Sequence, residues 1–253
     1  MKSNIRAFTL VEVLVVIAII AFLLAILPAP HHVRKPAIKK MAQIEMRGLV
    51  TAIEAYEQAY GCFPVSPEVQ AQAAANAGNK QSPDYTYGGT FSGTTVQTAG
   101  LFRTNAEVIA ILMDFTLIPG TTMPTVNAEH TRNARQIKFL AARLTSDNTA
   151  HGVGPDLVYR DPWGNPYLIS LDMNGDGLCR DAFYSRAAVS QNPPGTTYVQ
   201  TGFNGLSNPN TNVSDDFLFV GKIMIWSAGP DGKIDPTLPA NEGVNKDNLL
   251  SWQ

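Results

Sequence analysis

Oxygen-bearing side chains recur at alternate positions in a short loop in the C-terminal third of the chain. Asp172, Asn174 and Asp176 can converge on one hard cation, and Gly177 permits the sharp turn that this requires. Asp181 could supply a further carboxylate. The spacing predicts a calcium site, and the alternative is an Asp/Asn/Gly turn that joins two strands without a metal.

The comparison with known calcium loops supports only part of this site. The opening resembles an EF-hand-type loop, but Phe183 stands where that loop has a bidentate glutamate, and Asp181 could substitute from two positions earlier. A second group of aspartates, Asp231, Asp235 and Asp247, lies closer to the C-terminus. The chain therefore has two acidic loops that could hold a cation.

One more carboxylate, Glu12, lies inside a long apolar run from Phe8 to Leu27. Lys2 and Arg6 form a short basic leader before it. A run of this length can span a bilayer as a helix. An ionisable group within such a run is costly, which makes it a candidate functional residue with a partner.

The FTLVE segment at residues 8–12 resembles the processing site of type IV pilins and type II secretion pseudopilins. The resemblance implies that a prepilin peptidase cuts between Ala7 and Phe8 and methylates the new amino terminus. Glu12 then becomes the fifth residue of the mature chain. The family usually has Gly before the cut, where this chain has Ala7. The alternatives are a secretory signal peptide, which has a shorter apolar core, and a plain membrane anchor, which gives Glu12 no role.

A similar resemblance exists at the other end, in DPWGNPY at 161–167 and SAGPDG at 227–232. Both segments are similar to the C-terminal part of major type II secretion pseudopilins. The resemblance implies that the final loop binds calcium through Asp231 and Asp247, with Ser227 as a candidate carbonyl donor. The family has paired late acids where Lys246 precedes Asp247, and Asp235 could compensate.

Composition limits the remaining function classes. The chain has 253 residues and a net charge of -2, so it lacks the basic surface that nucleic-acid binding favours, and we expect no nucleic-acid partner. None of the four histidines neighbours a nucleophile in a recognisable motif, and no phosphate-binding glycine loop is present. The sequence therefore predicts a structural protein and not an enzyme.

The two cysteines, Cys62 and Cys179, allow two interpretations. In an oxidising compartment they could form one disulfide between the end of a helix and a distant loop. The alternative is a pair of buried, unpaired thiols, since spacing alone does not establish disulfide geometry.

Hydrophobic periodicity predicts a helix from Pro36 to about Tyr60, ending at Gly61. The residues expected on its buried face are Ile38, Met41, Ile44, Leu49, Ile53 and Tyr56. Composition predicts a long connecting loop over 66–104. Short helical elements are expected at 106–115, capped by Asn105, and at 133–144. Strands are expected at 166–171 and 217–227, with a possible short one at 183–186.

These elements give an α+β fold with long loops. The resemblance adds a pilin-like arrangement, in which one long N-terminal helix has an apolar first half and an amphipathic second half packed on a small antiparallel sheet. The expected division is a leader at 1–7, a transmembrane or filament-core helix at 8–30 and a globular domain at 31–253.

The resemblance at both ends implies a subunit of a type II secretion pseudopilus. Its partners would be copies of itself in a helical filament, other pseudopilins, the prepilin peptidase and the inner-membrane secretion platform. The chain would be a single-pass protein of the bacterial inner membrane with a periplasmic or extracellular domain that binds calcium. The alternatives are a type IV pilus subunit for adhesion, motility or DNA uptake, and a membrane-anchored calcium-dependent binding protein or enzyme.

Overall fold

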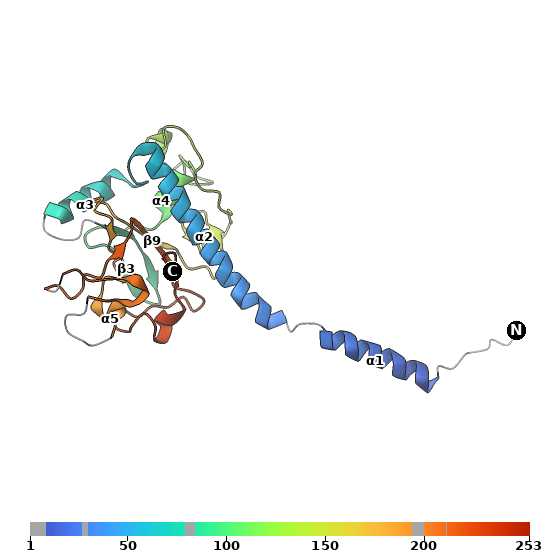
Figure 1. Ribbon diagram of the computed structural model, residues 1–253. Coiled ribbons are helices and arrows are strands. Elements are labelled where there is room, and N and C mark those ends of the chain that lie inside the picture. The colour runs from blue at the N-terminus through green and yellow to red at the C-terminus, as the bar shows by residue number, and fades with distance from the viewer. Residues whose placement is uncertain (1–8, 27–29, 79–83, 194–199, 211) are drawn as a thin grey trace. The chain divides into compact units, whose positions relative to one another are not determined.

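The structure is a computed structural model that describes residues 9–26, 30–78, 84–193, 200–210 and 212–253. The chain divides into two compact units, Met1–Ile38 and Lys39–Gln253. Short helices and small antiparallel sheets follow an N-terminal helix, so the fold is α+β (Figure 1). The predicted leader at 1–7 and the residue Phe8 lie outside the described residues.

The first helix, α1, spans Leu10–Ile26. Its large apolar side chains from Leu10 to Leu23 are between 49% and 80% exposed, because they point in all directions around the helix. The predicted helix over 8–30 is not described as one element, since α2 begins at Pro30 and residues 27–29 lie outside the described residues. Among the described residues, no helix has both the length and the apolar content needed to cross a membrane.

Helix α2 spans Pro30–Tyr60, so the predicted start at Pro36 is wrong. Pro30 is the first helical residue, a position where a missing N–H costs nothing. The predicted end is confirmed: Gly61 adopts the left-handed conformation, with φ at 71°, and donates its N–H to the carbonyl of Glu57 at 2.7 Å.

The buried face of α2 differs from the prediction. Met41 and Ile44 are 45% and 68% exposed, whereas Leu49 is fully buried. The predicted stripe contained a step of five residues between Ile44 and Leu49, which does not stay on one side of a helix. Steps of three and four residues define the actual buried face, which consists of Ala42, Met46, Leu49, Ile53 and Tyr56.

The central sheet has four antiparallel strands in the order β1-β6-β9-β10. They are β1 (Tyr85–Tyr87), β6 (Leu168–Leu171), β9 (Ile223–Ser227) and β10 (Leu249–Leu250). The predicted strand 166–171 is confirmed as β6. The predicted strand 217–227 is divided into β8 (Phe219–Val220) and β9, because the chain turns at Gly221 and Lys222.

Side chains on alternate positions of the sheet enter two different cores. Ile169 and Ile225 belong to the core that α2 covers. Leu168 and Trp226, their neighbours in sequence, belong to a second core under the C-terminal loops. Because successive side chains of a strand point to opposite faces, this sheet is buried on both sides.

Three smaller hairpins or pairs complete the strands. Strand β2 (Gly89–Phe91) pairs with β3 (Thr94–Val96), and β4 (Gly152–Val153) pairs with β5 (Tyr159–Arg160). Strand β7 (Leu178–Cys179) pairs with β8. The remaining helices are α3 (Pro67–Gly78), α4 (Ala106–Leu112) and α5 (Ala187–Ser190), with 3₁₀ turns at Ala128–His130, Phe203–Gly205 and Gly243–Asp247.

The prediction of one long loop over 66–104 is wrong, because this segment contains α3 and strands β1 to β3. Ser66 caps α3 by accepting the N–H of Val69 at 3.3 Å, and Pro67 occupies the first helical position. The polar composition concealed an alanine-rich stretch with high helix propensity.

Asn105 has a larger role than the predicted helix cap. The helix predicted at 106–115 is α4, but the Asn105 side chain makes no capping bond. Its amide donates to the carbonyls of Tyr159 and Tyr167, at 2.9 and 2.7 Å, and accepts the N–H of Tyr159. One buried side chain thus ties the start of α4 to strand β5 and to the residue before β6.

Two other predicted elements are absent from the described structure. Segment 133–144 is irregular and not helical; the N–H groups of Phe139 and Leu140 both bond to the carbonyl of Leu112, which holds the segment against the end of α4. Segment 183–186 is a turn and not a strand, because Asp181 accepts the N–H groups of Phe183 and Tyr184 at 2.8 Å each.

Candidate functional site

The two C-terminal segments with the sequence resemblance contact each other directly. Ser227, the last residue of β9, donates its hydroxyl to Oδ2 of Asp161 at 2.5 Å, and both residues are fully buried. The other oxygen of Asp161 accepts the N–H groups of Trp163 and Asn165, at 2.9 Å each. Burial raises the pKa of Asp161, although these hydrogen bonds act in the opposite direction.

A second contact joins the same two turns. The amide of Asn165 donates to the carbonyl of Gly229 at 2.9 Å. Gly229 has φ at 69°, and a Cβ added there would lie 2.3 Å from the carbonyl oxygen of Asp247. Only glycine therefore fits where turn 227–232 passes between turn 161–167 and the last 3₁₀ turn.

This packing places Asp247 near Asp231. Burial, followed by the negative charge of Asp231, raises the pKa of Asp247, while Lys39 acts in the opposite direction. Oδ1 of Asp247 is buried without a hydrogen-bond partner among the described residues. An unpaired buried oxygen beside a like charge suits a bound proton or a bound cation.

The other predicted ligands of this loop lie in different surroundings. Asp235 accepts the N–H and the hydroxyl of Thr237, at 2.8 and 2.6 Å, within its own exposed turn. Ser227 uses its hydroxyl for Asp161 and its backbone pairs with Leu249 in the sheet. The structure therefore brings together Asp231 and Asp247 and leaves Asp235 apart.

In the first acidic loop, the carboxylate of Asp172 accepts the N–H groups of Gly175 and Gly177, at 2.7 and 2.8 Å. Asn174 donates to Asp176 at 2.8 Å. These bonds are those of a polar turn, the metal-free alternative of the prediction.

Asp181, the predicted fourth ligand, lies in the core and is fully buried. Besides the two N–H groups named above, it accepts the hydroxyl of Ser170 at 2.6 Å and the indole N–H of Trp226 at 2.9 Å. Four donors satisfy its carboxylate, so Asp181 does not fit a calcium site in this loop. Over the described part of the chain, no three His, Cys, Asp or Glu side chains are grouped so that they could hold a metal ion.

At the N-terminal end, Glu12 has a local partner. Its Oε2 accepts the N–H and the hydroxyl of Thr9, at 2.8 Å each, and its own N–H donates to the Thr9 hydroxyl at 3.3 Å. This reciprocal arrangement is a capping box at the start of α1. The processing residues Ala7 and Phe8 lie outside the described residues.

Comparison with known proteins identifies this N-terminal segment. Residues 2–28 match the family model of the prokaryotic N-terminal methylation motif. This motif is the hallmark of type IV pilin-like and pseudopilin proteins. The chain carries a type IV pilin-like N-terminus. Searches of curated proteins and of solved structures gave no significant match.

The motif indicates a structural pilin-like subunit, a precursor for processing by a prepilin peptidase and for assembly into a filament. It also suggests a membrane-anchored subunit. It covers residues 2–28 only, so it does not distinguish a pilus from a secretion pseudopilus.

The cysteines of this pilin-like chain do not form the predicted disulfide. Cys62 and Cys179 are both free, Cys62 exposed and Cys179 buried. Both cysteines are therefore unpaired, as in the alternative prediction of two buried thiols, but only Cys179 is buried. Burial also raises the pKa of Cys179, which keeps it in the unreactive thiol form.

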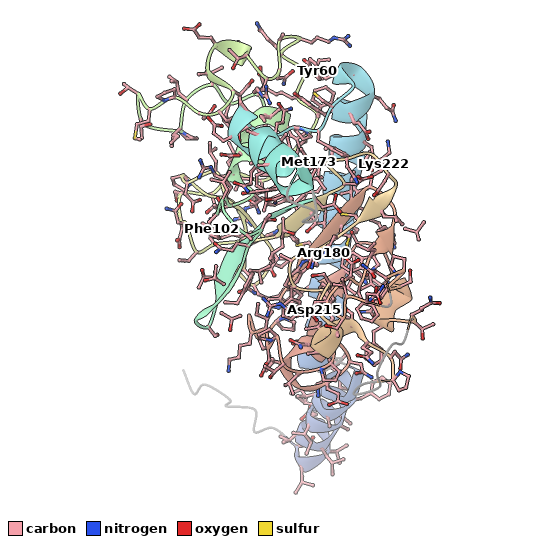
Figure 2. All side chains as sticks on the ribbon, turned by 90° about the vertical axis from the view of Figure 1, so that its left-hand side faces the viewer. Tyr60, Phe102, Met173, Arg180, Asp215 and Lys222 are labelled. Carbon is pink, nitrogen blue, oxygen red and sulfur yellow. The ribbon has the colours of Figure 1, made fainter. Side chains whose placement is uncertain are left out.

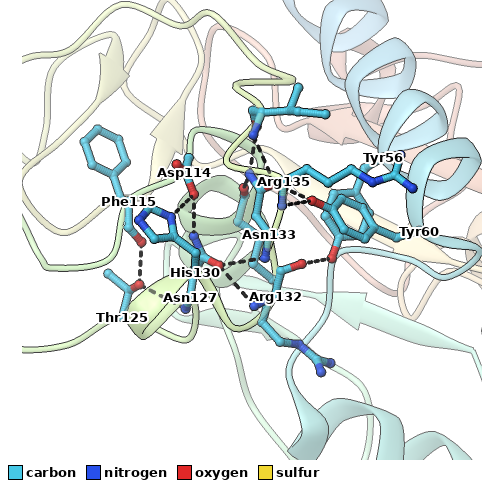
Figure 3. Close-up of polar contacts among 12 residues, drawn as sticks. Tyr56, Tyr60, Asp114, Phe115, Thr125, Asn127, His130, Arg132, Asn133 and Arg135 are labelled. Carbon is cyan, nitrogen blue, oxygen red and sulfur yellow. Dashed lines mark hydrogen bonds and ion pairs between the residues drawn. The ribbon is translucent and has the colours of Figure 1, made fainter.

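A polar network that the sequence did not reveal lies at the C-terminal end of α2 (Figure 3). Tyr56 donates to the carbonyl of Arg132, and Tyr60 donates to Oδ1 of Asn133, at 2.5 and 2.7 Å. Asp114 accepts from Asn127 at 3.0 Å and contacts Nδ1 of His130 at 2.7 Å. The network fixes the segment after α4 to the helix. His130, one of the histidines without a recognisable motif in the sequence, is one of its members.

A second histidine joins α2 to the sheet. Glu45 of α2 contacts Nε2 of His151 and accepts the hydroxyl of Tyr167, at 2.6 Å each. The contacts of His130 with Asp114 and of His151 with Glu45 hold separate segments of the fold together. Both contacts join residues that are distant in the sequence, 16 residues apart for His130 and Asp114 and 106 for His151 and Glu45, so no local pattern indicates them.

Proposed function

We propose that this chain is a structural subunit of a type II secretion pseudopilus. It would be inserted as a prepilin, cleaved before Phe8, N-methylated and assembled into a helical fibre with copies of itself and other pseudopilins. The observation that carries the proposal is the contact between turns 161–167 and 227–232, through Ser227 and Asp161, in a chain with the methylation motif.

Helix α1 supports the filament role. Its apolar side chains are exposed on every side, so copies of the helix can bury them against one another in a fibre core. Contacts between different surfaces of identical subunits, repeated without closure, produce a filament. In this proposal, the pilin-like arrangement is completed by α2 on the sheet, where the Leu49 face is buried.

Glu12 would pair with the amine of Phe8 on a neighbouring subunit. A buried charge without a partner is strongly destabilising, so a misaligned subunit would be rejected and the pair would set the axial register. The capping box with Thr9 competes with this role as an explanation for Glu12.

Calcium in the C-terminal loop is part of the proposal. Asp231 and Asp247 would hold the ion, with backbone carbonyls supplying further oxygens. The ion would offset the like charges of the two carboxylates and hold turn 227–232 in shape for lateral packing.

Mass spectrometry of the mature chain tests the processing step. The expected N-terminus is an N-methylated Phe8, and a chain that keeps Met1 would refute the cleavage between Ala7 and Phe8.

Substitutions at Glu12 and Thr9 separate charge pairing from helix capping. Glu12→Gln retains a capping-box residue but removes the charge, whereas Thr9→Ala removes the cap and retains the charge. We expect Glu12→Gln to insert in the membrane but fail to form fibres, and Thr9→Ala to assemble. Fibres of Glu12→Gln in normal amount would contradict the pairing role. Glu242→Gln, at an exposed position far from α1 in sequence, is the matched control.

Deletion of the gene distinguishes secretion from a pilus function. The proposal predicts that secreted proteins accumulate inside the cell envelope and that the wild-type chain restores their release. Normal secretion with loss of surface pili, adhesion or DNA uptake would favour the type IV pilus subunit, which the motif also supports.

A further inference from the structure

A polar pocket of about 650 Å³ opens on the second unit, Lys39–Gln253. It lies between α3, residues next to or within β1, segments 97–99 and 180–186, and residues Asn210, Val213, Asp215 and Asp216. Figure 2 shows two of its residues, Arg180 and Asp215, on the face turned to the viewer. The volume is within the range of pockets that hold small molecules.

Buried polar side chains line this pocket with unused hydrogen-bonding capacity. Ser185 is 2% exposed, and its hydroxyl has no hydrogen-bond partner within the described part of the chain. Asn76 is 4% exposed; its oxygen accepts from Gln72 at 2.8 Å, while its two amide protons have no described partner. Both groups line the pocket, where they can hydrogen-bond to a polar ligand or to bound water.

Thr98 adds a third polar group to the lining. Its Oγ1 accepts the N–H of Thr86 at 2.7 Å, and its own hydroxyl proton remains available. Together with Ser185 and Asn76, it offers hydroxyl and amide groups from three separate segments of the chain.

The charges at the rim of the pocket compensate one another. Arg180 donates to the carbonyl of Asp215 at 2.6 Å and pairs with Asp216 at 3.3 Å. Asp215 accepts the N–H of Ala187 at 2.9 Å. The lining also contains Arg186, so two arginines offset the charges of Asp215 and Asp216 at the rim.

One further carboxylate, Asp84, also lines the pocket and accepts the N–H groups of Met173 and Arg180. Burial, with a smaller contribution from the charges of Asp172 and Asp176, raises the pKa of Asp84 to about 7. Below neutral pH it therefore acts as a neutral donor and acceptor.

Hydroxyl and amide groups without net charge suit a ligand that carries many hydroxyl groups of its own. None of the described lining residues is aromatic, and the aliphatic ones are Ala99, Ala182 and Val213, so the larger part of the lining is polar. We propose that this pocket binds a neutral carbohydrate, of the size of one or two sugar units. The inference is independent of the proposed secretion role.

Titration of sugars into the full-length chain tests this proposal. The chain is kept in micelles of an alkylphosphocholine detergent, whose head group carries no sugar. Ligand-observed saturation-transfer NMR is recorded with glucose, galactose, maltose and N-acetylglucosamine, and with glucuronate and inorganic phosphate as charged probes. We expect saturable binding of at least one neutral sugar and weaker binding of the charged probes. The hexose and N-acetylhexosamine arms distinguish plain glycans from amino-sugar polymers.

Two variants locate the binding. Ser185→Ala removes one hydrogen-bonding group, and we expect about a 3- to 10-fold loss of affinity. Ala99→Trp fills the rim from an exposed position and should abolish binding without disturbing the core. The matched controls are Ser146→Ala and Ala75→Trp, at exposed positions outside the pocket.

Several results would overturn the proposal. One is the absence of saturable binding by every neutral sugar to a chain whose circular dichroism melt shows that it is folded. Another is binding that survives Ala99→Trp at full affinity. Tighter binding of glucuronate or phosphate than of any neutral sugar would identify the pocket as an anion site and reject the assignment.

Discussion

The hydroxyl of Ser227 donates a 2.5 Å hydrogen bond to the carboxylate of Asp161, although 66 residues separate them in the chain. This bond joins the turn that enters β6 to the turn that leaves β9. Since β6 and β9 are neighbours in the central sheet, the bond closes one end of the sheet below the acidic loop that contains Asp231.

We predict that Ser227→Ala lowers the free energy of unfolding by about 1–3 kcal/mol, because a buried carboxylate loses a donor. The loss should be larger at neutral pH than at acidic pH. Burial raises the pKa of Asp161, and the hydrogen bond from Ser227 opposes this by stabilising the ionised carboxylate. Without the hydroxyl, the ionised form loses this stabilisation. Below this pKa the carboxyl is protonated and the hydroxyl contributes less.

Chemical denaturation at several pH values measures this difference. Ser146→Ala, at an exposed site, is the control. An equal loss at every pH would show that the bond is not made to an ionised Asp161.

The corrected face of α2 gives a second prediction. Leu49→Ala should cost about 2–5 kcal/mol, because this side chain is fully buried against the sheet. Ile44→Ala, on the same helix but 68% exposed, should change the free energy of unfolding by less than about 0.5 kcal/mol. Thermal or urea unfolding of both variants measures the contrast. An equal loss of unfolding free energy in the two variants would show that Ile44 is buried as the sequence periodicity predicted.

Elements with a signal in adjacent residues could be predicted from the sequence. FTLVE is contiguous, Gly61 ends α2 by its own conformational preference, and the β-branched and aromatic runs of β6 and β9 form strands. Helix α3 has an equally local signal in Ser66 and Pro67, which the polar composition around it concealed. Local chemistry thus accounts for the end of α2, the start of α3 and the positions of β6 and β9.

What the sequence could not predict depends on contacts between distant segments. Asn105 has the residue type of a helix cap, but its partners Tyr159 and Tyr167 lie 54 and 62 residues away. Asp181 has the spacing of a calcium ligand, but its buried carboxylate accepts hydrogen bonds from Trp226 and Ser170 in the core. Residue type and spacing indicate which interactions a side chain could make. The side chains and backbone groups that the fold brings next to it determine which of these interactions it makes.

A third prediction concerns pH. Burial raises the pKa of Asp84 from its ordinary value of 3.8 to about 7. Between these values the folded chain keeps a proton that the unfolded chain has lost, so the free energy of unfolding should fall as pH rises from about 4 to about 7. The contribution of this group is at most about 4 kcal/mol.

Asp84→Asn stays neutral across this range and should reduce the slope. Its absolute stability is a poor test, because the amide cannot accept both N–H groups that now bond to the carboxylate. The measurement is therefore the change of the unfolding free energy between pH 4 and pH 7 in each chain. An unchanged slope in Asp84→Asn would contradict the raised pKa.

The last prediction tests calcium at the C-terminal loop. Added calcium should raise the melting temperature of the full chain in micelles, and chelation should reverse the effect, because an ion bound only by the folded state stabilises it. A concentration 100 times the Kd would add about 2.7 kcal/mol. Magnesium at the same concentration should act less, since it loses its water shell reluctantly.

Four variants assign the ligands. Asp231→Asn and Asp247→Asn should remove the response to calcium, whereas Asp235→Asn and Asp172→Asn should retain it, since the carboxylate whose charge acts on Asp247 is that of Asp231. In the absence of calcium, Asp247→Asn should stabilise the chain at neutral pH. This substitution removes a carboxylate whose pKa is raised by burial and by the charge of Asp231.

The two effects of Asp247→Asn have opposite signs, which separates a calcium site from a merely structural turn. A residue needed only for the turn would lower the melting temperature with and without the ion. A ligand that repels Asp231 raises it without calcium and loses the gain when calcium is added. If calcium shifts the melting temperature of neither the wild-type chain nor Asp235→Asn, the loop binds no calcium, and the buried Oδ1 of Asp247 is held as a protonated carboxyl instead.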